Sequence, residues 1–173
     1  MTIVLVGPPA SGKTTVGRAL ATQLDKPFLD VDLVIERTQG KSISEIFLDE
    51  GEAHFRALER ATTLELLGGD GVLSLGGGAV MDPEIRQALS DHEVVWLQVS
   101  VTHATRRVGM NVMRPLVLGD VRANLERLQA EREPLYREVA RHAVDTTQLK
   151  PHEVVAQIMA ALDVEGGQPE GER

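Results

Sequence analysis

Residues 7–14 read Gly-Pro-Pro-Ala-Ser-Gly-Lys-Thr, which matches the phosphate-binding loop pattern G-x-x-x-x-G-K-[ST]. An apolar run precedes this loop at residues 3–6, and residues with helical spacing follow it as far as residue 24. The motif requires this order of strand, loop and helix, so the flanks disfavour a chance match in an unrelated loop. The sequence therefore predicts that the protein binds a nucleoside triphosphate.

The residue types of the loop explain how it would bind phosphate. The two glycines let the backbone curl so that its N–H groups converge, and the following helix adds the positive end of its dipole. We expect the lysine to reach the β- and γ-phosphates and the threonine hydroxyl to face Mg²⁺. The predicted nucleotide-binding residues of this stretch are Gly7, Ala10, Ser11, Gly12, Lys13, Thr14 and Thr15.

Composition limits the class of protein. A chain of 173 residues is long enough for one domain with its own core. Its net charge of −8 argues against a nucleic-acid partner, because phosphate backbones bind basic surfaces. Without cysteine it has neither disulfides nor a thiolate metal site. Without a leader or an apolar run of membrane-spanning length, we expect a cytoplasmic protein with no membrane partner.

Short apolar strands alternate with helical patterns along the chain. The predicted strands are residues 2–6, 28–31, 72–75, 93–99 and 142–145. This alternation predicts an α/β fold with a five-stranded parallel sheet and helices on both faces. We expect a single domain over residues 1–165, with a mobile lid at about 109–121 and a disordered tail at 166–173.

Two carboxylates, Asp30 and Asp32, come at the end of the second predicted strand. A spacing of two residues in a strand puts both side chains on one face. The third and fourth predicted strands end without an aspartate, so these two are the candidates to help hold Mg²⁺ or to accept a hydrogen bond from a substrate hydroxyl. Asp32 is also a suitable cap for the following helix, and both interpretations can hold together.

Three glycines, residues 76–78, follow the third predicted strand. They allow a ligand to approach bare backbone N–H groups, although a flexible connector is the alternative. Arg56 and Glu59 lie three residues apart on one predicted helix and so face the same side, but spacing alone favours a solvated surface pair. The same holds for Arg137.

Two further arginines lie at or near the predicted lid. Arg114 is a candidate clamp on the transferring phosphoryl group, because it places a cation on a loop beside a phosphate site. Arg107 lies at the base of the same loop, and the sequence pattern does not decide whether it faces the nucleotide or solvent.

Taken together, the chain resembles the shikimate kinases from about Ile3 to Leu162, which adds a P-loop kinase fold to the α/β prediction. The matching segments, in order, are GPPASGKTT, FLDVD, GEAHFRALE, LSLGGGAV, MRPL, EPLYREVA and VDT. The pairing of FLDVD with FR-x-x-E and GGGAV is more specific than the phosphate loop, which many kinases share. The resemblance implies ATP-dependent phosphorylation of the 3-hydroxyl of shikimate.

The resemblance also implies roles for single residues. Asp32 would bind the substrate hydroxyls and is the candidate general base, and Asp30 would help hold Mg²⁺ through water beside Thr14. Glu59 would orient Arg56. Lys13, Asp32 and Arg114 would be catalytic, and Arg107 and Arg114 would contact ATP. The implied shikimate-binding residues are Asp32, Arg56, Gly77, Gly78 and Arg137.

The chain departs from the family pattern at Leu149, where an arginine that packs over adenine is usual, and at Gly109-Met110, where two glycines are usual. The first departure leaves the adenine contact open. Two other functions stay open as well: a related small-molecule kinase such as a gluconate kinase, and a nucleotide-dependent switch without a small substrate. We expect ATP and shikimate as partners, Mg²⁺ as cofactor, and a monomer.

Overall fold

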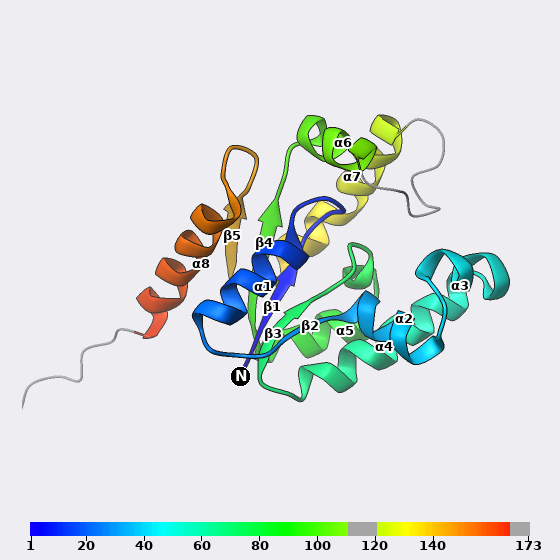
Figure 1. Cartoon of the computed structure of the whole chain (residues 1–173), viewed down its shortest axis with the longest axis horizontal. Helices are drawn as coiled ribbons and strands as arrows, with labels where there is room; N and C mark the ends of the chain where they lie inside the picture. The colour runs from blue at the N-terminus through cyan, green and yellow to red at the C-terminus, as the bar shows by residue number, and fades with distance from the viewer. Residues whose placement is uncertain (111–120, 167–173) are drawn as a thin grey trace, which may run out of the picture.

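The computed structural model describes residues 1–110 and 121–166, with side chains up to residue 107 and over residues 121–163 (Figure 1). Except for a few residues at their ends, the predicted lid at about 109–121 and the predicted tail at 166–173 lie outside the described residues. No helix within the described ranges is both long and apolar enough to cross a membrane.

The five predicted strands form one parallel sheet in the order β2-β3-β1-β4-β5, which confirms the predicted fold class. Val4 of the central strand pairs with Leu73 on one side and with Val94 on the other. The strands are β1 (Thr2–Val6), β2 (Phe28–Asp30), β3 (Gly71–Ser74), β4 (Glu93–Gln98) and β5 (His142–Asp145).

Helices cover both faces of the sheet, as Figure 1 shows. On one face lie α1 (Lys13–Gln23) and α8 (Pro151–Gly166). The helices packed on the other face are α2 (Val31–Gln39), α3 (Ile43–Glu50), α4 (Glu52–Leu67), α5 (Pro83–Ala88) and α7 (Val121–Val139). The remaining elements are α6 (Val101–Met110), which packs beside α7, and two 3-10 helices, η1 (Ala79–Met81) and η2 (Leu89–Asp91).

The core consists of two apolar clusters separated by the sheet. Val4 and Val6 of β1 belong to the cluster beneath α2, α4 and α7, whereas Ile3 and Leu5 belong to the cluster beneath α1 and α8. All five residues of β1 are buried, because successive side chains point to opposite faces and helices cover both. The apolar run at residues 3–6 is therefore the centre of the molecule, and it delivers the phosphate loop at its carboxyl end.

Candidate active site

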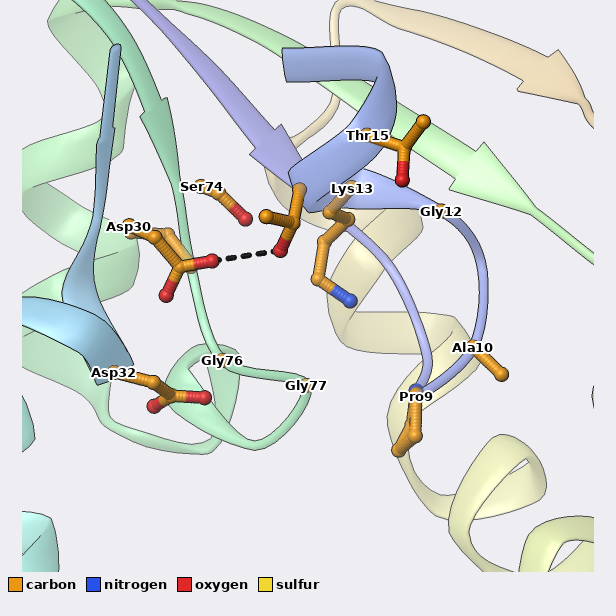
Figure 2. Close-up of a pocket in the computed structure, with 12 residues that line it drawn as sticks. Pro9, Ala10, Gly12, Lys13, Thr15, Asp30, Asp32, Ser74, Gly76 and Gly77 are labelled. Carbon is orange, nitrogen blue, oxygen red and sulfur yellow. Dashed lines mark hydrogen bonds between the residues drawn. The ribbon is translucent and has the colours of Figure 1, made fainter. Parts of the chain in front are cut away.

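A cavity of about 230 Å³ lies at the carboxyl ends of β1, β2 and β3 (Figure 2). This is the edge at which open parallel sheets bind their ligands. The cavity is lined by the phosphate loop and the start of α1, by the residues at the end of β2, and by the turn that follows β3. These residues are Pro9, Ala10, Gly12, Lys13, Thr14, Thr15, Asp30, Asp32, Ser74, Leu75, Gly76 and Gly77.

The phosphate loop has the conformation that its glycines permit. Gly12 has φ +88°, a left-handed conformation, at the residue before α1 begins. The Lys13 ammonium donates hydrogen bonds to the carbonyl oxygens of Gly7 and Pro8, both at 2.9 Å. The lysine therefore lies back across its own loop, and its positive charge is held beside the start of α1, where the helix dipole also favours an anion.

Thr14 and Asp30, which both line this cavity, form a direct pair. The Thr14 hydroxyl donates to Asp30 Oδ2 at 2.8 Å. The other oxygen, Asp30 Oδ1, accepts a hydrogen bond from the backbone N–H of Leu33 at 3.3 Å, so Asp30 is the N-cap of α2. A hydroxyl and a carboxylate are oxygen donors of the kind that Mg²⁺ prefers.

Two details of the sequence prediction are wrong at this point. The strand ends at Asp30, and Val31 already begins α2, so Asp32 lies in the first turn of a helix and not on the same face of a strand as Asp30. The helix cap is Asp30 and not Asp32. The physical reason is that the Asp30 carboxylate satisfies an N–H of the first turn, which starts the helix two residues earlier than predicted. Both carboxylates nevertheless line the cavity.

The glycine turn, residues 76–78, packs closely against the functional side chains of α2 and α4. Asp32 and Glu59 are both buried, at 7% and 2% exposure. A Cβ atom added to Gly76 would lie 2.8 Å from Glu59 Oε2 and 3.1 Å from Asp32 Oδ1. Two buried carboxylates therefore lie so close to Gly76 that a side chain there would require them to move.

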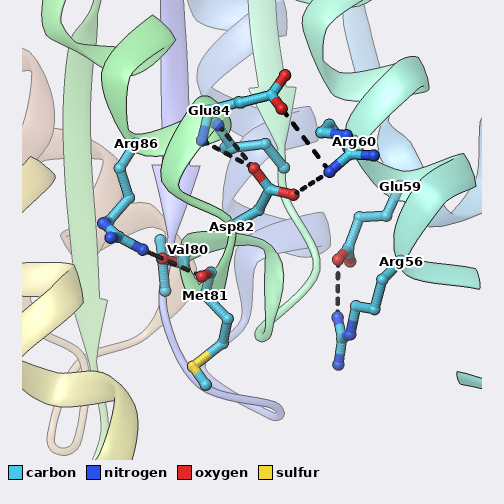
Figure 3. A network of polar contacts seen from close by, with 9 residues as sticks. Arg56, Glu59, Arg60, Val80, Met81, Asp82, Glu84 and Arg86 are labelled. Atoms are coloured by element: carbon cyan, nitrogen blue, oxygen red, sulfur yellow. Dashed lines mark hydrogen bonds and ion pairs between the residues drawn. The ribbon is translucent and has the colours of Figure 1, made fainter. Parts of the chain in front are cut away.

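Arg56 approaches the same turn two residues further along. A Cβ atom on Gly78 would lie 2.6 Å from both terminal nitrogens of the Arg56 guanidinium, and Arg56 Nη1 donates to Glu59 Oε1 at 2.7 Å (Figure 3). Because Glu59 is buried, this ion pair is not the solvated surface pair that the spacing alone favours. The three glycines are themselves buried, so the turn is enclosed by side chains rather than being a loose connector.

Helix α7 contributes two residues that the sequence reasoning missed. The Tyr136 hydroxyl donates a hydrogen bond to the Gly77 carbonyl at 2.5 Å, and burial raises the pKa of Tyr136 to about 12. Arg132, only 5% exposed, lies one helical turn before it, and a Cβ atom on Gly77 would be 3.3 Å from Arg132 Nη1. Arg132 Nε is buried and has no hydrogen-bond partner within the described residues.

The structure does not bring Arg137 to the glycine turn. Its side chain is 67% exposed, pairs with Glu133 at 2.7 Å and lies over the Trp96 ring at 5.9 Å. Successive residues of a helix are rotated by about 100°, so Arg137 lies about 140° around α7 from Arg132 and does not share its face. The spacing of four between Arg132 and Tyr136 was the signal in the sequence that could have identified the buried arginine.

The remaining predicted residues lie at the edge of the phosphate loop or beyond the described chain. Arg107 Nη1 donates to the carbonyl oxygen of Ala10 at 2.8 Å, which fastens α6 to the loop. Leu149 is partly buried and packs against the apolar cluster beneath α1 and α8. Arg114 lies outside the described residues.

Comparisons with known proteins identify the family. The family model described as shikimate kinase matches residues 9–163. A shikimate kinase of Salinispora arenicola is 52% identical over 160 residues, which cover 92% of this chain and 96% of that protein. The solved structure of a shikimate kinase from Acinetobacter baumannii, in complex with shikimate, superposes on this chain with a TM-score of 0.91 at 37% sequence identity. The alignment covers 96% of this chain and 95% of the Acinetobacter chain.

A more distant structure shares the fold alone. A gluconokinase from Sinorhizobium meliloti aligns over 95% of this chain and 92% of its own, with a TM-score of 0.59 and 20% identity. At that identity the likeness concerns the arrangement of strands and helices and says nothing about the acceptor.

Proposed function

We propose that this chain, which belongs to the shikimate kinase family, transfers the γ-phosphoryl group of ATP to the 3-hydroxyl of shikimate. Its shikimate kinase activity uses ATP and shikimate as substrates. One observation supports the assignment of shikimate as the acceptor. Two arginines and one carboxylate, Arg56, Arg132 and Asp32, converge on the buried glycine turn, and that turn borders the same cavity as the phosphate loop. Shikimate combines a carboxylate with three ring hydroxyls, and this set of side chains complements both kinds of group.

We assign the substrate carboxylate to Arg56 and Arg132. Guanidinium groups are permanently charged and can bind a carboxylate with two parallel hydrogen bonds. Arg56 is already oriented by its ion pair with Glu59, and Arg132 brings its Nη1 atom to the same glycine turn, 3.3 Å from where a Cβ atom on Gly77 would lie. Arg132 therefore takes the role that the sequence prediction gave to Arg137.

Asp32 is the proposed general base. In the reaction, the 3-hydroxyl oxygen forms a bond to the γ-phosphorus, the bond from that phosphorus to the β–γ bridging oxygen breaks, and ADP leaves. The hydroxyl proton passes to the Asp32 carboxylate. Phosphoryl transfer needs little covalent assistance, so we expect most of the rate enhancement to come from positioning and charge neutralisation.

Lys13, Thr14 and Asp30 serve the phosphoryl donor in this proposal. Lys13 exchanges its contacts with the loop carbonyls for the β- and γ-phosphates of ATP. Thr14 and Asp30 provide oxygen atoms for Mg²⁺, the aspartate through water, and this ion would neutralise part of the phosphate charge when bound. Within the described residues, no cluster of three or more His, Asp or Glu side chains offers an alternative metal site.

Other parts of the proposal rest on the sequence. Gly77 and Gly78 would contact shikimate through their backbone, and the remaining loop residues and Arg107 would contact ATP. Arg114 keeps its proposed place as a clamp on the phosphoryl group. We further propose one domain over residues 1–165 that acts as a monomer in the cytoplasm.

A coupled assay of ADP release tests this function with the full chain, MgATP and, in separate reactions, shikimate, gluconate, adenylate or buffer. We expect stimulation by shikimate alone. Stimulation by gluconate or adenylate and not by shikimate would contradict the proposed acceptor. Phosphorus–proton coupling in the nuclear magnetic resonance spectrum of the product then locates the phosphate, and a phosphate on another ring hydroxyl would refute the assignment to the 3-position.

A further inference from the structure

The glycine turn continues directly into η1 and then into α5. Three backbone hydrogen bonds hold this segment from within: Ala79 N–H donates to Gly76 O, Met81 N–H to Gly78 O and Asp82 N–H to Ala79 O, at 3.0–3.1 Å. Because the glycines have no side chains, only their backbone can anchor the turn to other elements, as the Gly77 carbonyl does by accepting the hydroxyl of Tyr136 on α7. Its position relative to α4 and α7 therefore depends on groups that reach it from neighbouring elements.

Arg86 on α5 is one such group (Figure 3). Its Nη1 atom donates to the carbonyl oxygens of Val80 at 2.7 Å and of Met81 at 3.1 Å. Its Nε atom donates to Glu138 Oε1 on α7 at 3.3 Å. One guanidinium thus joins the end of η1 to α7, and hydrogen bonds from a charged donor are stronger than those between neutral groups.

Opposite Arg86, the same segment is held by α4. Arg60 pairs with Asp82 at 3.2 Å, and Asp82 is the N-cap of α5. In Figure 3, Arg86 lies on one side of η1, while Arg60 and Arg56 lie on the other. The turn that carries the acceptor contacts is therefore fixed between two helices, α7 with Arg132 and α4 with Arg56.

We propose that Arg86 is a positioning residue for shikimate binding: by holding the Val80 and Met81 carbonyls, it sets the place of the glycine turn against Arg56 and Arg132. Arg86 itself touches no reacting atom. The inference rests on the proposed function, because it concerns the acceptor side of the same cavity. The proposal predicts that loss of the Arg86 side chain weakens the use of shikimate and leaves the use of ATP unchanged. The reason is that, among the described residues, the hydrogen bonds of Arg86 do not reach the phosphate loop.

Three variants of the full chain separate the contacts of Arg86. Arg86→Met keeps an apolar stem but removes every hydrogen-bond donor of the side chain. We expect kcat/KM for shikimate to fall by roughly 10- to 100-fold, because a small displacement of substrate-binding groups costs a rate factor of this size, and we expect the KM for ATP to stay unchanged. Arg86→Lys keeps one charged donor for the carbonyls and should recover much of the loss. Glu138→Gln is the matched control: it weakens only a partly exposed ion pair and should change kcat/KM by about twofold or less.

Amide hydrogen exchange supplies a readout that does not depend on activity. In Arg86→Met we expect faster exchange at Ala79, Met81 and Asp82, and unchanged exchange at Val16 behind the phosphate loop. Unchanged exchange in the turn, an equal rise of both KM values, or the same defect in Glu138→Gln would each overturn the proposal. If the wild-type chain fails to phosphorylate shikimate, the proposed function fails on that result, whereas the exchange data still decide whether Arg86 holds the turn.

Discussion

The hydroxyl of Tyr136 and the carbonyl of Gly77 meet in a buried hydrogen bond of 2.5 Å across 59 residues of chain. This bond joins α7 to the glycine turn, and Arg132 lies one helical turn before Tyr136 on the same face. Tyr136 also packs beside Trp96 of β4, with ring centroids 5.9 Å apart. The acceptor side of the cavity is therefore assembled by a contact that neither segment could form alone.

Replacing Tyr136 by Phe tests how much this contact stabilises the fold. The substitution leaves the buried Gly77 carbonyl without its donor, so we expect the free energy of unfolding to fall by about 1–3 kcal/mol. Urea unfolding measures this as a lower midpoint with an unchanged slope. A variant as stable as the wild type would show that water or another donor replaces the tyrosine hydroxyl.

The same residue predicts how stability depends on alkaline pH. Burial raises the pKa of Tyr136 to about 12 in the folded chain, against about 10 in the unfolded chain. The folded state therefore keeps the proton longer, so this contribution is fully present below about pH 10 and is lost as the pH rises to about 12, amounting to about 3 kcal/mol.

The measurement compares unfolding free energies of the wild type and Tyr136→Phe across this pH range, where their difference should shrink. Because the chain has one tyrosine, tyrosinate absorbance reports this residue alone. Ionisation near pH 10 in the folded protein would contradict the buried environment.

Arg132 and Arg137 make a matched pair for the carboxylate site, since they lie on the same helix with opposite exposure. Arg132→Met should weaken shikimate binding by about 10- to 100-fold, because charged hydrogen bonds contribute about 1.5–3 kcal/mol. Arg137→Met removes an exposed ion pair and should change affinity by about twofold or less. Titration calorimetry with shikimate measures both. The reverse order would restore Arg137 as the binding residue.

Asp32 and Asp30 form a second pair, which separates base catalysis from metal binding. Asp32→Asn should lower kcat by roughly 100- to 10,000-fold, the range for loss of a general base, at any Mg²⁺ concentration. Asp30→Asn should instead raise the Mg²⁺ concentration needed for half-maximal rate, and excess Mg²⁺ should restore much of the activity. Steady-state rates over a Mg²⁺ series check both variants, and recovery of Asp32→Asn by Mg²⁺ would argue against its role as the base.

The amino-acid sequence by itself determined the fold class, the phosphate loop and the family. These depend on local signals, namely the motif at residues 7–14 and the alternation of apolar strands with helices, which are legible in neighbouring residues. Only the tertiary structure decided that Asp30, not Asp32, caps α2, and that Arg132, not Arg137, faces the glycine turn. The physical reasons differ: α2 begins where the Asp30 carboxylate accepts the N–H of Leu33, whereas Arg132 and Arg137 lie about 140° apart around α7, so which of them is buried depends on where that helix packs.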